Sequence, residues 1–392
     1  MIQFNDLNTK TSLFDADVEE KKEMLDESIK SAKILVVGAA GTIGQSVTKE
    51  LFARDPGVLH AVDISENNLV ELVRDIRSTF GYIEGDFKTF AVPIESDEFT
   101  MLCKNEGPYD YIFNLSALKH VRSERDPYTL KRMVDVNVVN SIKLIRLAED
   151  MSVKKYFTVS TDKAANPANL MGATKRVMEY LNHTAGVPCS SARFANVAFS
   201  DGSLLHGFKN RILKGQPISA PADIKRYFLD EKEAGQLCLM SSILGEHSEI
   251  FFPKLEEGSH LISFTDIAKS FLAAKGYTVL ECDSEEQARS VARSGIVNDQ
   301  WPCYFFKSDT SGEKPTEEFY TEREKPNFSK FRKIGVVQHT LPINHNSEYS
   351  RSVIEESFNS IEIDYEIIKK TLVKFVPELD HIHKNRNLDE RM

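Results

Sequence analysis

Residues 33–44 read Lys-Ile-Leu-Val-Val-Gly-Ala-Ala-Gly-Thr-Ile-Gly and lead from an apolar β-type run into a segment of helical character. The three glycines are spaced three residues apart at this junction. Such spacing lets a pyrophosphate approach the backbone and the free N–H groups of a helix N-terminus. A glycine triplet alone also occurs in tight turns. The residue at the end of the next strand is therefore needed to support a cofactor site. The stretch predicts a dinucleotide-binding loop made of Gly38, Gly41, Thr42, Ile43 and Gly44.

The next expected strand, Val58–Val62, ends in Asp63, which follows Gly44 by 19 residues. A carboxylate at this distance accepts hydrogen bonds from both ribose hydroxyls of NAD. The residues directly after Asp63 include no arginine that would hold a 2′-phosphate, and this favours NAD over NADP. Ser65 and Asp86 are further predicted contacts of the cofactor.

Strands and helices alternate through the first half of the chain. Apolar runs at 109–115, 154–159 and 189–194 are expected to be strands, and segments 66–80 and 127–150 are expected to be helices. This βαβ rhythm predicts an α/β fold with a doubly wound parallel sheet of the Rossmann-like kind. Ligands bind at the carboxyl ends of such strands. Further predicted cofactor-site residues are Ser116, Ala117, Lys119 and Ser160, at or after expected strand ends, and Asn137, in the expected helix 127–150.

The stretch from Ser160 to Lys175 holds the candidate reactive groups. The strand before it ends in Thr161, Asp162 and Lys163, and an Asn-Pro pair then breaks the chain before a helix expected from about residue 171. An acid and an amine at a strand's carboxyl end are placed where ligands bind. A simpler alternative is that Asp162 and Lys163 cap the helix and form a surface ion pair, which is common and chemically silent.

Composition excludes several classes of function. The chain has 392 residues and a net charge of −10, which argues against nucleic-acid or anionic-membrane binding. No apolar run approaches the ~18 residues that a membrane span requires, and the N-terminus lacks a secretory signal pattern. The five cysteines are scattered without Cys-x-x-Cys spacing, so we expect reduced thiols, no metal site and a cytoplasmic protein.

Four regions are expected along the chain. Residues 1–31 form an N-terminal helical extension whose helix is capped by Asp15 and Asp17. Residues 32–195 form an NAD-binding Rossmann-like domain, to which 196–260 contribute later strands. A smaller mixed substrate-binding region spans 196–340, with an insertion or divergent stretch of unassigned function at 282–301 and irregular structure at 325–350. Residues 341–392 form a C-terminal helical extension, with an amphipathic packing or subunit-contact helix at 361–376.

Several motifs in order make the chain similar to a known family. Together with the glycine loop and the helix that carries Lys175, they resemble the extended short-chain dehydrogenase/reductase superfamily. Within it they resemble the nucleotide-sugar 4,6-dehydratases, in particular the UDP-N-acetylglucosamine 4,6-dehydratases of polysaccharide synthesis. The resemblance covers roughly residues 30–330. The motifs are Ala117–Val121, Ser160–Lys163, Asn169–Lys175, Arg193–Val197, Arg226–Phe228 and Gly312–Pro315.

The resemblance implies roles for the residues around the strand end. Asp162 is the expected acid and Lys163 the expected base, Thr161 bonds the sugar C4 hydroxyl, and Lys175 holds the nicotinamide ribose. Met171 occupies the position where the superfamily usually has a tyrosine, and a thioether cannot act as a general base. The base at C4 is therefore open, and our hypothesis is that Asp162 accepts the C4 proton and later serves the leaving C6 hydroxyl. Met171 would form an apolar wall.

The resemblance also implies a nucleotide-sugar substrate and a homo-oligomer. The predicted substrate-binding residues are Lys119, His120, Asn196, Arg226, Glu313 and Lys314. Asn196 is equally expected to be a buried amide that bonds loop backbone. Two other functions compete with dehydration, namely a nucleotide-sugar 4-epimerase and a non-catalytic NAD-binding protein. The nucleotide, the sugar and the fate of C5 stay open.

Overall fold

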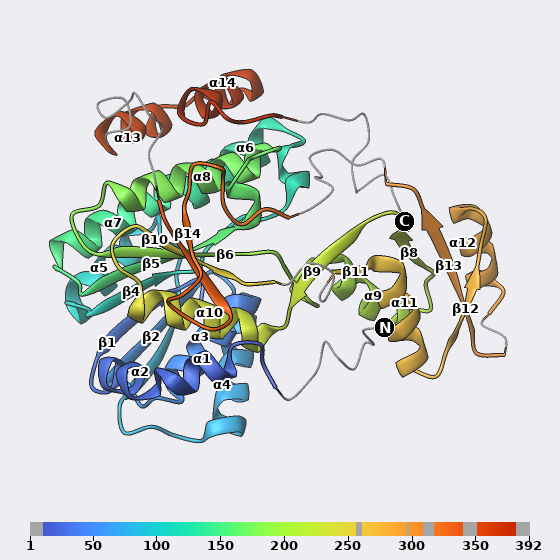
Figure 1. Cartoon of the computed structure of the whole chain (residues 1–392), viewed down its shortest axis with the longest axis horizontal. Helices are drawn as coiled ribbons and strands as arrows, with labels where there is room; N and C mark the ends of the chain where they lie inside the picture. The colour runs from blue at the N-terminus through green and yellow to red at the C-terminus, as the bar shows by residue number, and fades with distance from the viewer. Residues whose placement is uncertain (1–10, 256–260, 296–297, 309–316, 340–350, 382–392) are drawn as a thin grey trace.

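The computed structural model describes residues 11–255, 261–295, 298–308, 317–339 and 351–381. Figure 1 shows a larger lobe built around a twisted sheet and a smaller lobe beside it, joined by the strands of the middle of the chain. The predicted α/β class is confirmed, because the larger lobe is a mainly parallel sheet with helices on both faces.

The main sheet has nine strands among the described residues, in the order β14-β15-β10-β6-β5-β4-β1-β2-β3. Every pair from β10 to β3 is parallel, whereas β15 runs antiparallel to β10 and β14 antiparallel to β15. The chain order reverses between β1 and β4, which is the switch point where a doubly wound sheet binds its ligand. The strands are β1 (Lys33–Val37), β2 (Val58–Asp63), β3 (Asp86–Ala91), β4 (Tyr111–Asn114), β5 (Lys155–Thr161), β6 (Cys189–Phe194), β10 (Glu249–Pro253), β14 (Pro326–Asn327) and β15 (Ile334–Gln338).

Helices cover both faces of this sheet (Figure 1). Because successive strand residues point to opposite faces, Ile34 and Val36 of β1 pack in one core while Leu35 and Val37 pack in another. The first core includes α2 (Lys22–Ile29), α3 (Thr42–Phe52), α4 (Glu66–Phe80) and α10 (Glu231–Leu244). The second includes α5 (Asp97–Glu106), α6 (Pro127–Val134), α7 (Asn140–Asp150) and α8 (Leu170–His183).

The long helix expected at 127–150 is interrupted. Between α6 and α7 the chain forms a π-helical turn, Asp135–Val139, which contains Asn137. Such single turns widen a helix locally and often occur at functional sites. Here the turn places the Asn137 side chain toward the loop that follows β4.

The N-terminal residues differ from expectation. Asp15 and Asp17 were predicted helix caps, but they lie inside α1 (Asp15–Glu20), whose N-cap position is Phe14. The Asp17 carboxylate instead accepts hydrogen bonds from the backbone N–H groups of Arg332 and Lys333, at 2.6 and 2.7 Å. These long-range bonds hold α1 against the segment that leads into β15. Residue spacing along the sequence does not indicate this contact.

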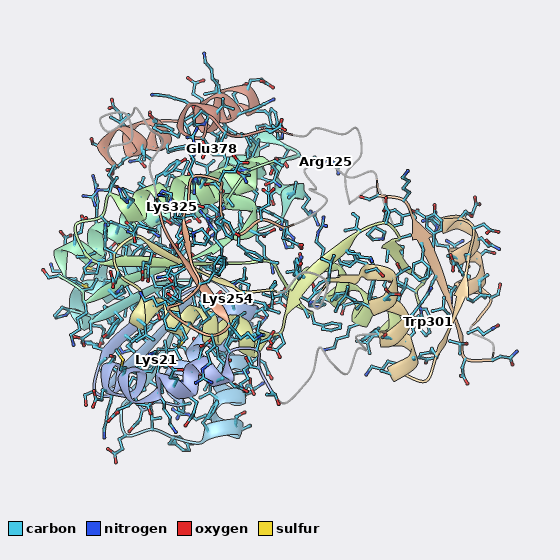
Figure 2. The ribbon with its side chains drawn as sticks, viewed as in Figure 1. Lys21, Arg125, Lys254, Trp301, Lys325 and Glu378 are labelled. Carbon is cyan, nitrogen blue, oxygen red and sulfur yellow. The ribbon has the colours of Figure 1, made fainter. Side chains whose placement is uncertain are left out.

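One expectation for the second half was wrong in part, and a stretch of unassigned function has a defined place in the fold. Residues 325–350, expected to be irregular, include β14 and β15, which extend the main sheet. The stretch at 282–301 is part of a β-α-β unit in the smaller lobe, where its helix joins the parallel strands β12 and β13, and β13 also pairs with β8. The unit comprises β12 (Thr278–Glu281), α12 (Glu285–Arg293) and β13 (Gln300–Phe306), and β8 spans Ile218–Pro221. Trp301 is buried in this lobe (Figure 2), where its indole N–H donates to the Gln216 carbonyl at 3.0 Å.

A second small sheet connects the lobes. It consists of β7 (Asn196–Val197), β9 (Lys225–Leu229) and β11 (Leu261–Ser263), in the order β11-β9-β7. The core of the smaller lobe also includes α9 (Leu204–Leu213) and α11 (Phe264–Ala274). Because β7 follows β6 directly, this sheet starts at the carboxyl edge of the main sheet.

The last helices pack on the larger lobe. α13 (Arg351–Asn359) and α14 (Tyr365–Phe375) lie over α6, α7 and α8 (Figure 1), and α14 contributes Ile368, Leu372 and Phe375 to the second core. The helix predicted at 361–376 is thus present and packs within its own chain. Within the described residues, no helix combines the length and apolar character that crossing a membrane requires.

Candidate functional site

The glycine loop forms a cradle between β1 and α3. Gly38 has a φ of +77°, and a Cβ there would lie 2.5 Å from the Ser116 backbone nitrogen. A Cβ on Gly44 would overlap the Gly38 carbonyl oxygen. Only glycine fits at these two positions. Gly41 is the N-cap residue of α3, where a Cβ would have no neighbour nearer than 3.7 Å, so the start of this helix is open. These residues fit a dinucleotide pyrophosphate.

Asp63 lies at the carboxyl end of β2 and joins the cradle. One of its oxygens accepts from the Ala40 N–H at 3.0 Å and the other from the Ser65 N–H at 2.9 Å. Each carboxylate oxygen keeps a further lone pair for a ribose hydroxyl. Ser65 caps α4 by accepting from Asn68 N–H, so its hydroxyl has a structural partner. Thr42, at the start of α3, accepts from the backbone N–H of Asp201 in the smaller lobe.

Asp86 does not belong to this site. It is the first residue of β3 and pairs with Val58, the first residue of β2, whereas Asp63 pairs with Ala91 at the other end. The prediction failed because the strand begins earlier than its apolar residues suggest. The Asp86 carboxylate pairs with Lys88 at 2.6 Å on the opposite edge of the sheet.

The loop after β4 is held by two buried asparagines. Asn114, which was not predicted, accepts from the Ser116 hydroxyl at 2.7 Å. Asn137 accepts from the Leu118 N–H and donates to both the Leu118 carbonyl and the Thr174 hydroxyl, at 2.9 to 3.0 Å. Asn137, a predicted contact of the cofactor, thus positions the loop that carries Ser116 and Ala117.

The acid and the amine lie together directly after β5. Asp162 has a side chain that is 6% exposed, and Lys163 one that is 34% exposed. The Lys163 Nζ lies 3.2 Å from one Asp162 oxygen, to which the Thr161 hydroxyl also donates at 2.7 Å. The caps are other residues, because Thr161 caps the short turn at Asp162–Ala164 and Asn169 caps α8. The reading of Asp162 and Lys163 as helix caps is therefore wrong.

Met171 and Lys175 lie one turn apart on α8, on the same face. Met171 is 3% exposed, and its backbone N–H donates to Glu124 at 2.7 Å. Lys175 is also 3% exposed, and its Nζ donates to the Val159 carbonyl at 3.1 Å. Burial lowers the pKa of Lys175 to about 8, although the carboxylate of Glu179 acts in the opposite direction. A buried amine of this kind marks a site where charge is used.

Ser160 belongs to a buried ion network, whereas it was predicted to contact the cofactor. Its hydroxyl donates to Glu179 at 2.6 Å. Arg193 bonds Glu179 and Glu324 through both sides of its guanidinium, at 2.7 to 2.9 Å, and Arg176 bonds the same two carboxylates. The network ties the 319–324 segment to α8 and β6. Its carboxylates were missed because they are scattered along the sequence.

Lys119 and His120 face the turn that leads into α9. The Lys119 Nζ donates to the Ser200 hydroxyl at 3.3 Å, and the His120 ring lies against Gly202. Burial lowers the pKa of both residues, and the neighbouring Lys119 charge lowers that of His120 further. Both side chains therefore stand between the lobes, where a ligand that bridges them would pass.

Asn196 and Arg226 converge on a carboxylate that was not predicted. The Asn196 amide donates to Glu317 at 3.0 Å and toward the carbonyl of Tyr227 in β9 at 3.4 Å. Its backbone partner thus lies in a strand, whereas one expectation was a bond to loop backbone. The Arg226 Nε lies 3.6 Å from the same Glu317 oxygen. Glu313 and Lys314 lie outside the described residues.

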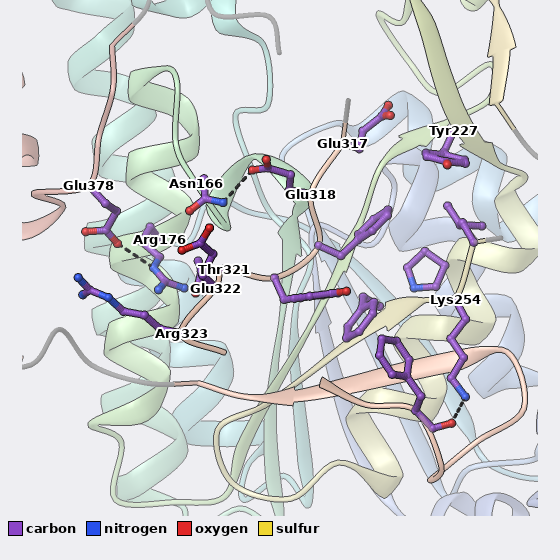
Figure 3. A pocket seen from close by; sticks show the side chains of 16 residues that line it. Asn166, Arg176, Tyr227, Lys254, Glu317, Glu318, Thr321, Glu322, Arg323 and Glu378 are labelled. Carbon is purple, nitrogen blue, oxygen red and sulfur yellow. Dashed lines mark hydrogen bonds and ion pairs between the residues drawn. The ribbon is translucent and has the colours of Figure 1, made fainter. Parts of the chain in front are cut away.

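A cavity of about 890 Å³ opens beside these groups. Figure 3 shows it between the strand ends and the segment that starts at Glu317, with the Asn166 amide bonded to Glu318 and Arg176 to Glu378 across one side. Its lining combines charged side chains with the aromatic rings of Tyr227, Phe252, Phe319, Tyr320 and Phe328. A cavity of this size accommodates a small organic ligand.

The family of polysaccharide biosynthesis proteins matches residues 34–339. The chain belongs to this family. The resemblance that its motifs indicated is confirmed, because the relatives that it matches include proteins named UDP-N-acetylglucosamine 4,6-dehydratase and UDP-glucose 4-epimerase.

Three relatives illustrate the range of the family. A protein of Methanocaldococcus jannaschii, named an uncharacterized membrane protein, is 34% identical over 58% of this chain and 67% of its own length. The capsular polysaccharide biosynthesis protein CapD of Staphylococcus aureus is 28% identical over 66% of this chain. The match spans 43% of the length of CapD. An inverting UDP-N-acetylglucosamine 4,6-dehydratase of Campylobacter jejuni is 27% identical over 57% of this chain and 66% of the relative.

Solved structures share the fold at lower identity. Pen from Bacillus thuringiensis has a TM-score of 0.64 at 23% identity and covers 80% of this chain and 89% of its own. A UDP-N-acetylglucosamine 4-epimerase from Methanobrevibacter ruminantium has a TM-score of 0.53 at 16% identity, covering 90% and 100%. The dTDP-glucose 4,6-dehydratase DesIV of Streptomyces venezuelae, solved with NAD, has a TM-score of 0.54 at 17% identity, covering 73% and 88%.

Proposed function

We propose that the protein is an NAD-dependent nucleotide-sugar 4,6-dehydratase that converts UDP-N-acetylglucosamine to a UDP-4-keto-6-deoxy sugar. The observation that carries this proposal is the Asp162–Lys163 pair at the carboxyl end of β5. In the sheet, only β4 lies between β5 and β1, the strand that leads into the glycine cradle. The named activity of the Campylobacter jejuni relative supports the choice of substrate.

NAD bound in the cradle supplies the redox chemistry, since it can take a hydride from sugar C4 and return one at C6. Gly38, Gly41 and Gly44 give the pyrophosphate room, and Asp63 accepts the ribose hydroxyls. The absence of an arginine from residues 64–68, directly after Asp63, favours NAD over NADP. Lys175 holds the nicotinamide ribose and adds positive charge.

The proton transfers fall to the residues after β5. Asp162 accepts the proton of the C4 hydroxyl, which Thr161 orients, because Met171 offers no titratable group. The ketone formed at C4 acidifies the C5 proton, which Lys163 removes. Asp162 then donates the proton that it accepted at C4 to the C6 hydroxyl, which leaves as water. Met171 is an apolar wall that excludes solvent from these charges.

Epimerisation at C4 is the competing function, and it requires a C4 base but no acid–base pair for C5 and C6. The adjacent acid and amine therefore favour dehydration. A non-catalytic NAD-binding protein would leave the buried Lys175 and the Asp162–Lys163 pair without a purpose. Incubation with NAD and a panel of nucleotide sugars separates all three, because dehydration alone removes one water from the sugar.

A further inference from the structure

Glu317 is a buried carboxyl group that the reaction as proposed above does not use. Its side chain is 3% exposed. One oxygen, Oε1, accepts from the Asn196 amide at 3.0 Å and lies 3.6 Å from the Arg226 Nε. The other oxygen, Oε2, is buried and has no hydrogen-bond partner in the part of the chain that the structure describes.

An unpaired carboxylate oxygen in such a place is costly, and a proton on it relieves the cost. Burial raises the pKa of Glu317 to about 7, with the charge of Asp162 adding to the rise, while the charges of Arg226 and Lys163 oppose it. Near neutral pH the group is therefore divided between acid and carboxylate, which suits a residue that gives and regains a proton.

Glu317 lies beside a cavity and within electrostatic range of the residues that follow β5. It lines the cavity of about 890 Å³, and Figure 3 shows it between Glu318 and Tyr227 at the rim. Its charge interacts with those of Asp162 and Lys163, from the end of β5. The hydrogen bond from Asn196 on β7 and the contact with Arg226 on β9 both engage Oε1, so neither of them occupies Oε2.

We propose that Glu317 is a catalytic residue that donates the proton to the sugar C6 hydroxyl as the C6–O bond breaks. This inference rests on the proposed dehydratase function. Asp162 accepts the proton of the C4 hydroxyl. Lys163 accepts the C5 proton and later returns it to C5. Glu317 gives its proton to the C6 hydroxyl, which leaves as water. After product release, the proton on Asp162 restores Glu317 through solvent.

This assignment separates two tasks that would otherwise fall on Asp162. With Met171 in place of a phenol, Asp162 is needed as the base at C4. The buried carboxyl group of Glu317 supplies the acid at C6. Neither Asp162 nor Glu317 then has to act as both base and acid within one catalytic cycle.

The test compares Glu317→Gln with the wild type on two substrates, UDP-N-acetylglucosamine and its 6-deoxy-6-fluoro analogue. Glutamine keeps the shape and a polar contact to Asn196 but donates no acidic proton. Fluoride, unlike hydroxide, leaves without protonation. We expect turnover of the hydroxyl substrate to fall by roughly 10²–10⁴-fold, the range of general acid catalysis, and elimination of fluoride to stay within a few-fold of the wild type. Glu356→Gln, an exposed carboxyl on α13, is the matched control.

A second readout is the pH profile. Wild-type turnover of the hydroxyl substrate should fall as the pH rises through about 7, since the acid form of Glu317 is lost, and this limb should be absent with the fluoro substrate. If Glu317→Gln is unimpaired, or equally impaired on both substrates, Glu317 is not the acid while dehydration itself stands. If the wild type releases neither water nor fluoride, the proposed function fails and this inference fails with it.

Discussion

The ammonium group of Lys175 donates to the backbone carbonyl of Val159 at 3.1 Å, with its side chain almost fully buried on α8. Among the described residues, no carboxylate lies within ion-pair distance of it. The carbonyl fixes the amine beside the strand end that carries Thr161 and Asp162, but it cannot neutralise a positive charge. The fold therefore keeps a buried cation that lowers its stability. Such destabilising charges are typical of functional sites.

Lys175→Met should stabilise the protein without ligand and abolish its activity. Since burial lowers the pKa of Lys175 from 10.5 to about 8, its charge opposes folding below pH 8, and this effect fades as the pH rises toward 10.5. At about 1.36 kcal/mol per pKa unit, we expect a gain of roughly 1–3 kcal/mol at pH 7. Denaturant unfolding at pH 7 and pH 10 measures it, with the exposed Lys275→Met as control. Equal or lower stability at pH 7 would contradict the account.

Asp162→Asn should stop the reaction before it begins. If Asp162 accepts the C4 proton, the amide removes the base, and turnover should fall by roughly 10²–10⁴-fold. A single-turnover absorbance trace should then show no build-up of NADH, although NAD still binds. NADH that forms and persists would instead place Asp162 in the elimination alone, with another group as the C4 base.

Asp63→Ser should weaken NAD binding and narrow the preference over NADP. The carboxylate is held by Ala40 and Ser65 N–H groups in the orientation that receives ribose hydroxyls, and it repels a 2′-phosphate. Calorimetric titration of both cofactors into both proteins checks this. Tighter binding of NADP than NAD by the wild type would refute the cofactor assignment.

Glu324→Gln should destabilise the fold strongly. Its carboxylate is fully buried between Arg193 and Arg176, and although burial acts to raise its pKa, these two arginines hold that pKa far below the ordinary 4.5. Removing one partner of a buried pair costs about 3–5 kcal/mol. Because the pKa of Glu324 is lowered in the folded state, the loss in unfolding free energy relative to the wild type should be largest above pH 4.5. It should become smaller as the pH falls below 4.5.

Glu378→Gln is the control for this experiment. It also pairs with Arg176, but its side chain is 30% exposed, and such pairs contribute about 1 kcal/mol or less. A loss in Glu324→Gln no larger than in Glu378→Gln would show that the buried network does not secure the 319–324 segment.

The parts of this molecule that were predictable from the sequence are those set by short spacings. The glycine loop, Asp63 and α4 follow from a strand, a turn and a helix in succession, where each residue's neighbours along the chain are also its neighbours in space. The Thr161–Lys163 group follows in the same way from the end of β5.

What was missed depends on contacts between distant segments. Glu317 is recognisable as a candidate site residue only in the fold, where it contacts Asn196 and Arg226, about 90 or more residues earlier in the chain. Asn196 and Asn137 were expected to contact ligands, but the fold gives their amides protein partners, and a sequence cannot show which hydrogen bonds are already made. β15 was hidden because its five residues follow a polar, irregular stretch.

The most direct test of the account is mass spectrometry of the nucleotide sugar after incubation with the wild-type protein and NAD. The account predicts that UDP-N-acetylglucosamine loses one water and gains a keto group, with solvent deuterium entering at C5. A product of unchanged mass with altered C4 stereochemistry, or no turnover of any nucleotide sugar, would contradict it.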